Sequence, residues 1–380
     1  MRVTGDWIDN KGTQDLMKAL LDSGYQALFV GGCVRNALLG VAVADVDIAT
    51  DATPTRVMAL AKAAKMKPVP TGVEHGTVTV VSGGIAHEVT TFRKDVETDG
   101  RRAVVAFATD LADDAHRRDL TMNALYANAD GTVVDPLGGL DDLKARRVRF
   151  IDDAEARIRE DYLRILRFFR FHAWYGDPAK GMDVTALAAI SANLDGLDTL
   201  SRERVAAETL KLLAAPDPAP AVAAMAQIGV LVRILPGADC RALAPLVHLE
   251  EGRTPDPIRR LAVLGGHDIN IHLRLSNADA RRLAVLWQET GSDKGISEIA
   301  YRYDSETAID IALLRAASLG TPVDPNAMAQ AAKGASATFP VKAADLMPNL
   351  QGAALGARLK EIEARWIASD FTLTRDQLLN

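Results

Sequence analysis

The segment from residue 28 to residue 50 constrains the fold of this chain more than any other. It reads LFVGGCVRNALLGVAVADVDIAT. An apolar run leads into Gly31 and Gly32, and a stretch with apolar residues at helical spacing follows and stops at Gly40. This order predicts a strand, a glycine turn and a short helix. The glycines allow a ligand to approach the backbone, and the start of the helix offers unpaired N–H groups, so the turn is a candidate phosphate site.

Two aspartates end the same segment. Asp45 and Asp47 alternate with apolar residues, so in a strand both carboxylates project from one face. Like charges there repel each other unless a divalent cation lies between them, and hard oxygen ligands suit Mg²⁺ bound with a substrate's phosphates. Alone, a glycine turn is usually only a turn and an Asp-x-Asp pair is usually a solvated strand edge. Together they predict a nucleoside triphosphate site, with the glycines and Arg35 on the phosphates and the aspartates on the metal.

These motifs resemble those of a known family. GG-x-VR followed by D-x-DIAT is similar to the signature of class II tRNA nucleotidyltransferases (CCA-adding enzymes) and of the related bacterial poly(A) polymerases, in the DNA polymerase beta-like nucleotidyltransferase superfamily. The resemblance implies an α+β fold, with a palm-like head built on a mixed β-sheet and then an all-α neck, body and tail. One position departs from the pattern: this chain has Asn36 where the family commonly has Asp. No catalytic role is therefore carried over to that side chain.

Length and composition set wide limits. The 380 residues suffice for two or more domains, and 48% are hydrophobic and 25% charged. The two cysteines, Cys33 and Cys240, support neither a disulfide scaffold nor a zinc site. The net charge of −6 argues against nucleic acid as a partner unless a local basic face outweighs it. With no long apolar run and no signal-peptide pattern at the start, we expect a cytoplasmic protein that does not contact a membrane.

A third carboxylate follows in a predicted hairpin. Residues 75–82 and 85–93 alternate around Gly83 and Gly84, which indicates two antiparallel strands. Glu88 lies on one face of the second strand, and on the residues alone it could be an ordinary surface glutamate. Its segment, HEVTTFR, is similar to the family segment whose acid completes a metal-binding triad. The resemblance thus implies that Asp45, Asp47 and Glu88 together hold two Mg²⁺ ions.

The chain from residue 94 to residue 116 is polar and charged, with a turn signal at residues 98–100. Such a long connection is either a disordered loop or a functional one. CCA-adding enzymes have a flexible loop at this place that helps to switch the site from C to A. The resemblance therefore argues against an enzyme that adds only CC.

The next polar cluster contains Arg118, Asp119 and Asn123. A solvated helix start would explain some of these residues, but two consecutive arginines followed by an asparagine also suit a clamp on ribose and phosphate. The cluster is similar to the family motif RRD-x-x-x-NA, whose Asp and Arg are taken to recognise the ribose of the incoming nucleotide. A break rich in glycine and proline at residues 135–139 resembles the family's hinge between head and neck.

From residue 144 the pattern changes to helices only. The sequence EDYLRILR predicts that Asp161, Arg164 and Arg167 lie near one another on one helix. A fixed Asp and Arg can offer an acceptor and a donor to the Watson–Crick edge of a base, and an internal salt bridge is the alternative. The resemblance favours base selection, because the family's ED-x-x-R-x-x-R motif reads C or A. The same comparison assigns Glu203 and Arg204 a supporting, structural role.

We therefore predict a catalytic head at residues 1–143, a helical neck at 144–215 and a helical body and tail at 216–380 that binds tRNA. The predicted function is template-independent, Mg²⁺-dependent addition of CCA to the tRNA 3′ end from CTP and ATP, with no obligatory protein partner. A poly(A) polymerase or an enzyme that adds only A shares nearly all these motifs and is the first alternative. The second alternative is an RNA-binding protein without activity. The predicted nucleotide-binding residues are Gly31, Gly32, Arg35, Arg118, Asp119, Asn123, Asp161, Arg164 and Arg167.

Overall fold

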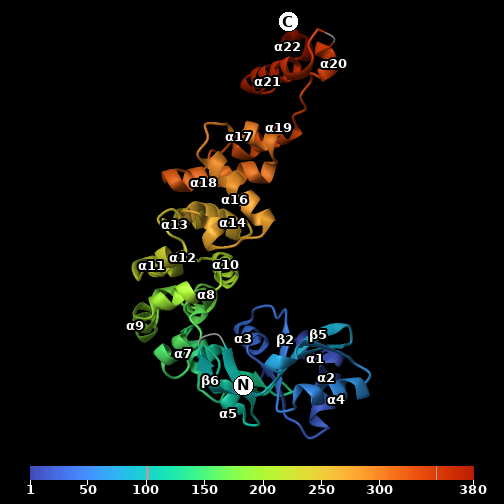
Figure 1. Cartoon of the computed structure of the whole chain (residues 1–380), viewed down its shortest axis with the longest axis vertical. Helices are drawn as coiled ribbons and strands as arrows, with labels where there is room; N and C mark the ends of the chain where they lie inside the picture. The colour runs from blue at the N-terminus through green and yellow to red at the C-terminus, as the bar shows by residue number, and fades with distance from the viewer. Residues whose placement is uncertain (100–101, 348) are drawn as a thin grey trace. The chain divides into compact units, whose positions relative to one another are not determined.

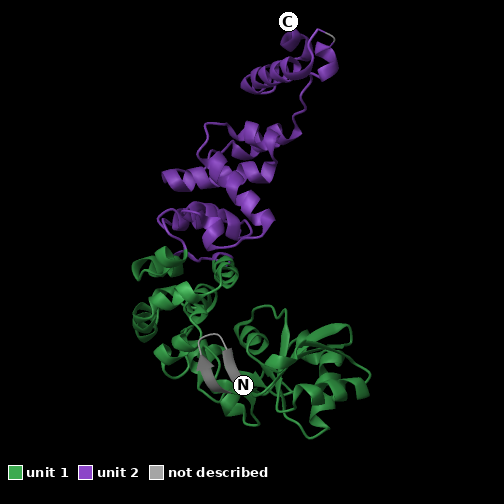
Figure 2. Cartoon of the chain, in the orientation of Figure 1, with its two compact units in different colours: residues 1–212, 220–234 green, residues 213–219, 235–380 purple. Residues whose placement is uncertain are grey.

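The computed structural model describes residues 1–99, 102–347 and 349–380. This part of the chain forms two compact units: residues 1–212 with 220–234, and residues 213–219 with 235–380 (Figure 2). Unit 1 contains the β-sheet and the helices that follow it up to residue 234. The regular elements in the described part of unit 2 are all helices. The predicted boundaries at residues 143 and 215 remain predictions.

A mixed β-sheet forms the first part of unit 1 (Figure 1). Its strand order is β3-β4-β5-β2-β1-β8-β9, with β2 parallel to β5 and the other neighbours antiparallel. The mixed sheet and α+β class predicted from the sequence are confirmed. The strands are β1 (Ala27–Val30), β2 (Val46–Thr50), β3 (Lys67–Gly72), β4 (Thr77–Ser82), β5 (Ile85–Thr91), β8 (Tyr126–Ala127) and β9 (Val133–Val134).

Alternation of apolar residues fixes the face that each hairpin strand buries. In β4, Val78 and Val80 are buried, and in β5, His87 and Val89 are buried while Glu88 is exposed. The helices between the strands begin where polar residues end the apolar pattern; Asn10, for example, accepts hydrogen bonds from the N–H groups that open α2. These helices are α1 (Asp6–Asp9), α2 (Lys11–Leu21), α3 (Gly32–Leu39), α4 (Pro54–Ala63) and the 3₁₀ turn η1 (Val73–His75).

Two segments between the strands have features of their own. Thr53 precedes α4, but its side chain makes no cap hydrogen bond; Pro54 lacks an N–H and already suits the first turn. The polar connection after β5 is not a plain loop, because β6 (Arg93–Asp99) and β7 (Arg102–Phe107) pair as a separate two-stranded sheet. Residues 100 and 101, where the predicted turn ends, lie outside the described residues.

The helices of unit 1 that follow the sheet pack around aromatic side chains. Phe168 stacks on Phe150 with ring centroids 5.6 Å apart, and it contacts Phe169 edge-on at 5.4 Å. These rings are fully buried, as expected for core residues. Two helical elements, α5 (Leu111–His116) and η2 (Thr121–Asn123), precede β8. Those after β9 are α6 (Gly139–Lys144), α7 (Ala154–Glu160), α8 (Leu163–Tyr175), η3 (Pro178–Lys180), α9 (Val184–Ala192), η4 (Leu194–Thr199), α10 (Arg202–Leu213), α11 (Ala219–Gln227) and α12 (Val230–Ile234).

Unit 2 encloses a buried network of charges. Arg259 donates to Glu250 at 2.6 Å and to Asp310 at 2.7 Å, while Arg282 donates to Asp310 at 2.7 Å. Arg282 is therefore held by acids of its own unit. The helices are α13 (Leu243–Leu249), α14 (Pro257–Leu264), α15 (Ile269–His272), α16 (Asn277–Thr290), α17 (Ile296–Arg302), α18 (Ser305–Leu319), α19 (Ala327–Ser336), α20 (Ala343–Leu346), α21 (Gly352–Ala368) and α22 (Arg375–Leu379).

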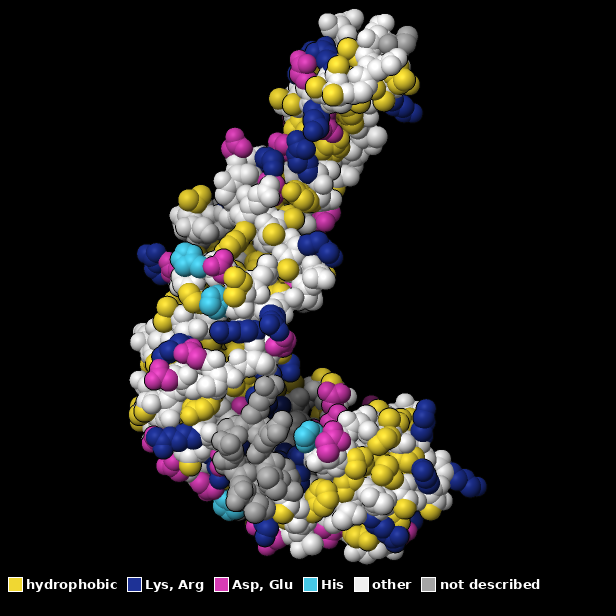
Figure 3. Space-filling model, viewed as in Figure 1, with side chains coloured by type: hydrophobic (Ala, Val, Ile, Leu, Met, Phe, Trp, Pro, Cys, Tyr) yellow, Lys and Arg dark blue, Asp and Glu magenta, His cyan; other side chains and the backbone are white. Residues whose placement is uncertain are grey.

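The visible surface mixes charges of both signs. On the face in Figure 3, Lys and Arg side chains lie among Asp and Glu side chains and do not gather in one large patch. A search of the described helices finds none with the length and apolar character that crossing a membrane requires.

Candidate active site

A cavity of about 440 Å³ in unit 1 brings most of the predicted site residues together. Seven arginines and four acids line it, which gives the lining an excess of three positive charges. Such a surface attracts a polyphosphate. The lining residues are Val30, Gly31, Gly32, Arg35, Asp47, Glu88, Thr90, Arg93, Arg117, Arg118, Asp119, Asn123, Asp161, Leu163, Arg164, Arg167, Phe171 and Arg204.

The predicted glycine turn forms one wall of this cavity. Gly31 has φ of 68°, a left-handed conformation that favours glycine, and α3 begins at the next residue. A Cβ atom at Gly31 would lie 3.5 Å from Nη1 of Arg118, so the turn and the arginine are neighbours. The first N–H groups of α3 and the Arg118 guanidinium thus flank one place that suits an anion.

The parallel pairing of β2 and β5 sets two carboxylates side by side. Asp47 pairs in register with Glu88, and both residues line the cavity. Burial raises the pKa of Asp47 to about 6, and the neighbouring charge of Glu88 adds to this shift, with a smaller effect from Asp45. The fold therefore forces like charges together at a cost to the ionised form of Asp47.

The Asp47–Glu88 pair suits a hard cation, whereas Asp45, the third predicted ligand, lies outside the paired strands. Asp45 is exposed and precedes the first residue of β2. In the part of the chain that the structure describes, no group of three His, Cys, Asp or Glu side chains is arranged to hold a metal ion. Mg²⁺ commonly takes only one or two carboxylates and completes its coordination with water and substrate phosphates, so Asp47 and Glu88 fit this ion.

Arg35, predicted to contact phosphate, is occupied by several partners within the protein. Its Nη1 donates to Oδ1 of Asn123 at 2.5 Å, and its Nη2 donates to Oδ1 of Asn36 and to the hydroxyl of Tyr175, both at 2.9 Å. The side chain is 6% exposed. Arg35 thus lines the cavity from a fixed position, and Asn36 serves as one of its acceptors.

Asp119 holds two other predicted residues in place. Its Oδ1 accepts from Nδ2 of Asn123 at 2.9 Å, and its Oδ2 accepts from Nε of Arg167 at 2.6 Å. Burial alone would raise the pKa of Asp119, but the Arg167 guanidinium and the Asn123 amide hold it well below its usual range. Asp119 is buried and is not at a solvated helix start, which excludes that alternative for this residue.

Arg118 is oriented from behind by a buried acid. Its guanidinium donates to Asp114 at 3.0 Å and to the hydroxyl of Tyr126 at 3.1 Å. Asp114 also accepts from Nε of Arg117 at 2.9 Å. Neither Asp114 nor Tyr126 was singled out from the sequence, because a lone acid and a lone tyrosine carry no pattern.

One prediction about the base-reading residues is wrong in its geometry. Asp161 does not share a helix with Arg164, because α7 ends at Glu160 and α8 begins at Leu163. Asp161 accepts from Nη2 of Arg204 at 2.6 Å, while Arg164 binds Glu160 and, at 3.2 Å, the carbonyl oxygen of Arg117. The extended backbone of Asp161 breaks the helix that the apolar spacing suggested. Both side chains nevertheless line the cavity.

Seven further residues of the lining were not predicted as site residues: Val30, Thr90, Arg93, Arg117, Leu163, Phe171 and Arg204. Arg93 and Arg117 belong to segments already singled out, HEVTTFR and RRD, so their proximity in sequence was an available signal. Phe171 is buried, with 4% of its surface exposed, and it also belongs to the cavity lining.

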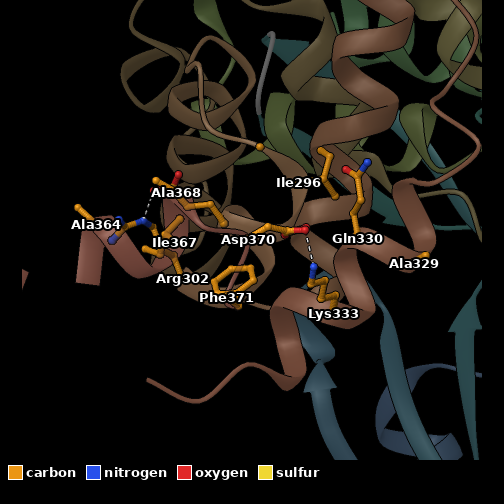
Figure 4. Close-up of a pocket in the computed structure, with 13 residues that line it drawn as sticks. Ile296, Arg302, Ala329, Gln330, Lys333, Ala364, Ile367, Ala368, Asp370 and Phe371 are labelled. Atoms are coloured by element: carbon orange, nitrogen blue, oxygen red, sulfur yellow. Dashed lines mark hydrogen bonds and ion pairs between the residues drawn. The ribbon is translucent and has the colours of Figure 1, made fainter. Parts of the chain in front are cut away.

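A second cavity, of about 590 Å³, lies in unit 2 among α17, α19 and α21 (Figure 4). Its charged groups pair with each other: Lys333 with Asp370, and Arg302 with Glu298 at 2.7 Å. Small and apolar side chains supply most of the remaining lining. None of the predicted site residues lies here.

Comparisons with known proteins agree with the geometry of the first cavity. Residues 27–149 match the family described as the poly A polymerase head domain, and residues 182–241 match the one described as the probable RNA and SrmB-binding site of polymerase A. The mouse mitochondrial CCA tRNA nucleotidyltransferase 1 is 32% identical over 392 positions, which cover 97% of this chain and 89% of the relative. The chain belongs to the CCA-adding enzyme family. The family predicted from the sequence motifs is thus confirmed, and with it the class of enzyme, a nucleotidyltransferase.

Other members of the CCA-adding enzyme family are similar over part or all of the chain. The CCA-adding enzyme of Geobacillus thermodenitrificans is 42% identical over 58% of this chain, and the human mitochondrial enzyme is 42% identical over 53%. These two alignments span only about half of each relative, 54% and 47%. The crystal structure of the Bacillus stearothermophilus CCA-adding enzyme in complex with CTP has a TM-score of 0.77 at 29% identity, covering 95% of this chain and 93% of that one.

Proposed function

We propose that this protein adds CCA to the 3′ end of tRNA, using CTP and ATP, without a nucleic acid template and with release of pyrophosphate. The observation that carries the proposal is the arginine-lined cavity in which the Asp47–Glu88 pair faces the glycine turn of α3. The names of the relatives support the same activity. One structural relative at 29% identity was solved with CTP bound.

In this scheme the cavity binds the triphosphate of the incoming nucleotide. The turn at Gly31 and Gly32 offers backbone N–H groups, and Arg118 adds a charged donor held by Asp114. The excess of positive charge offsets the charge that builds up on the departing pyrophosphate. Arg35 contributes its charge from a fixed place in the wall, and the Asp119–Asn123 pair in the cavity lining is our proposed contact for the ribose.

Asp47 and Glu88 would hold Mg²⁺ together with oxygens of the triphosphate, and the exposed Asp45 beside them is our proposed third ligand. When bound, the metal would lower the pKa of the RNA 3′-hydroxyl and would offset the negative charge of the leaving pyrophosphate. The chain's own part is to hold the Asp47 carboxylate beside that of Glu88, which the β2–β5 register achieves.

Base selection is the proposed task of Asp161, Arg164 and Arg167. Asp161 and Arg164 come from neighbouring elements, and each is held by a separate partner, Arg204 or Glu160. Each carboxylate oxygen of Asp161 already accepts one hydrogen bond, from Leu163 N–H or Arg204, and keeps a second lone pair. That lone pair and the remaining N–H groups of Arg164 are our proposed acceptor and donor for the edge of a base. Arg164→Ala should therefore relax the choice among CTP, ATP, UTP and GTP, and unchanged selectivity would contradict this role.

The decisive experiment is incubation of the purified protein with Mg²⁺ and tRNA that lacks its 3′ CCA, with CTP, ATP or both, followed by sizing of the products at single-nucleotide resolution. We expect two added nucleotides with CTP alone and three with both. Asp47→Asn should abolish incorporation, because it removes a charge from the metal pair while it keeps the shape of the side chain. Incorporation by this variant at the rate of the unaltered protein would refute the metal assignment.

The same assay separates the alternatives. Long products with ATP alone would indicate a poly(A) polymerase, and a single A added only to tRNA that already ends in CC would indicate an A-adding enzyme. Binding of tRNA without any product would indicate an inactive RNA-binding protein. A cytoplasmic location is part of the proposal, and cell fractionation tests it.

A further inference from the structure

Arg35 is clamped between the phosphate turn and the far end of another helix. It lies in the first turns of α3, and its guanidinium carbon is 4.2 Å from the ring centroid of Tyr175 and 5.1 Å from that of Phe171. Its Nη2 also donates to the Tyr175 hydroxyl at 2.9 Å. Tyr175 therefore contacts the Arg35 guanidinium both through its ring and through its hydroxyl.

Tyr175 acts from outside the cavity. It is the last residue of α8, partly buried, and in the described chain it does not belong to the lining of the cavity, which Arg35 does line. Any effect of Tyr175 on a bound nucleotide must therefore pass through Arg35. No motif of the sequence analysis includes this tyrosine.

The two ends of α8 serve different parts of the proposed site. Its first turns carry Arg164 and Arg167, which line the cavity and are the proposed base-reading arginines, while its last residue holds Arg35 beside the glycine turn. Arg35 is further tied through Asn123 and Asp119 to Arg167, so a continuous chain of hydrogen bonds joins α3 to both ends of α8. A rigid helix fixed at two points sets one distance between the place for phosphate and the place for the base.

We infer that Tyr175 is a positioning residue for the nucleotide: by holding Arg35, it fixes the triphosphate seat of α3 at a set distance from the base-reading arginines of α8. This inference rests on the proposed function. Tyr175 touches neither the reacting groups nor the substrate, so its loss weakens binding of a nucleoside triphosphate and leaves the chemical step nearly unchanged.

The test compares Tyr175→Phe, which keeps the stacked ring and removes the hydroxyl, with Tyr175→Leu, which removes both contacts. The matched control is Trp174→Phe, which removes a hydrogen bond of 2.8 Å from the adjacent residue to the Lys211 carbonyl oxygen without touching Arg35. Steady-state incorporation of CTP and equilibrium binding of CTP and of CMP are measured for each protein. Thermal unfolding verifies that each variant is folded.

Loss of one hydrogen bond to a charged group through an intermediary should raise the KM for CTP about threefold to tenfold in Tyr175→Phe, with kcat changed by less than about twofold. Tyr175→Leu should show a larger rise. Binding of CMP should change less than binding of CTP, because CMP lacks the β- and γ-phosphates. Equal KM values in Tyr175→Phe and Trp174→Phe, or equal weakening of CTP and CMP, would overturn the inference. Failure of the unaltered protein to bind CTP would instead overturn the proposed function.

Discussion

The raised pKa of Asp47 predicts that the metal-free protein becomes more stable when its catalytic acid is neutralised. The side chain is partly buried beside Glu88, and its pKa is about 6 instead of the ordinary 3.8. A shift of this size corresponds to about 3 kcal/mol at most, since each unit equals about 1.4 kcal/mol. Partial solvation reduces the usable part, so Asp47→Asn should raise the free energy of unfolding by about 1–2 kcal/mol at pH 7.5 in EDTA.

The pH dependence of this effect has a definite sign. Between pH 3.8 and about 6 the folded protein retains a proton on Asp47 that the unfolded chain has already released. Stability of the unaltered protein therefore falls as the pH rises through this window, and the full penalty is present above pH 6. The advantage of Asp47→Asn should accordingly shrink as the pH falls from 7.5 to 4.5.

Urea unfolding of unit 1, followed by fluorescence in EDTA, measures both the stability gain of Asp47→Asn and its dependence on pH. Asp45→Asn is the matched control, because Asp45 is exposed and lies before β2; its replacement should change stability by less than about 0.5 kcal/mol. Added Mg²⁺ should stabilise the unaltered protein and have a much smaller effect on Asp47→Asn. If Asp47→Asn were no more stable than the unaltered protein at pH 7.5, or if its advantage were independent of pH, the electrostatic reasoning would be wrong.

Three further changes test the structural framework. Asp114→Asn should cost about 2 kcal/mol of stability at pH 7, because arginines hold the pKa of this buried acid at about 2. This stability is present above pH 3.8 and is lost as the pH falls toward 2. In an acid titration, the free energies of unfolding of the two proteins should therefore converge. Arg260→Ala should cost about 3–5 kcal/mol in chemical denaturation, since it removes one of the two arginines that pair with the buried Glu250 carboxylate and leaves the carbonyl oxygens of Leu213 and Ala215 without their donor. Gly131→Ala should destabilise more than Gly24→Ala in thermal unfolding: both have positive φ, but only at Gly131 would the Cβ meet a backbone oxygen at 2.3 Å.

Much of the first domain follows from local sequence patterns. The strand before Gly31, the helix after it and the hairpin around Gly83 all form where alternation and glycine placement predict them. Such features depend on neighbouring residues, which a sequence displays directly. The pairing of Asp47 with Glu88 required the family resemblance, because 41 positions separate the two residues along the chain and no local rule joins them.

Other features depend on contacts that the sequence does not display. The break of the helix at Asp161 was missed, since apolar spacing continues across it and the stabilising partner, Arg204, lies far along the chain. The internal use of Arg35 was also missed, because a motif identifies a residue type and not the partners of its side chain. Long-range hydrogen bonds of this kind decide whether an arginine is available to a ligand or already satisfied.

The register between β2 and β5 has a consequence for how this family can change over time. His87 anchors β5 from within the protein, with Nε2 2.9 Å from the hydroxyl of Thr13 on α2. Residues can be gained or lost in the turns between the two strands without altering which side chains stand opposite each other. One residue inserted inside β5 ahead of Glu88 would exchange the roles of inward and outward side chains, turning the acid toward the core. Length variation among related chains should therefore be common in the outer connections and nearly absent from these few strand positions, a pattern that comparison of many sequences can check.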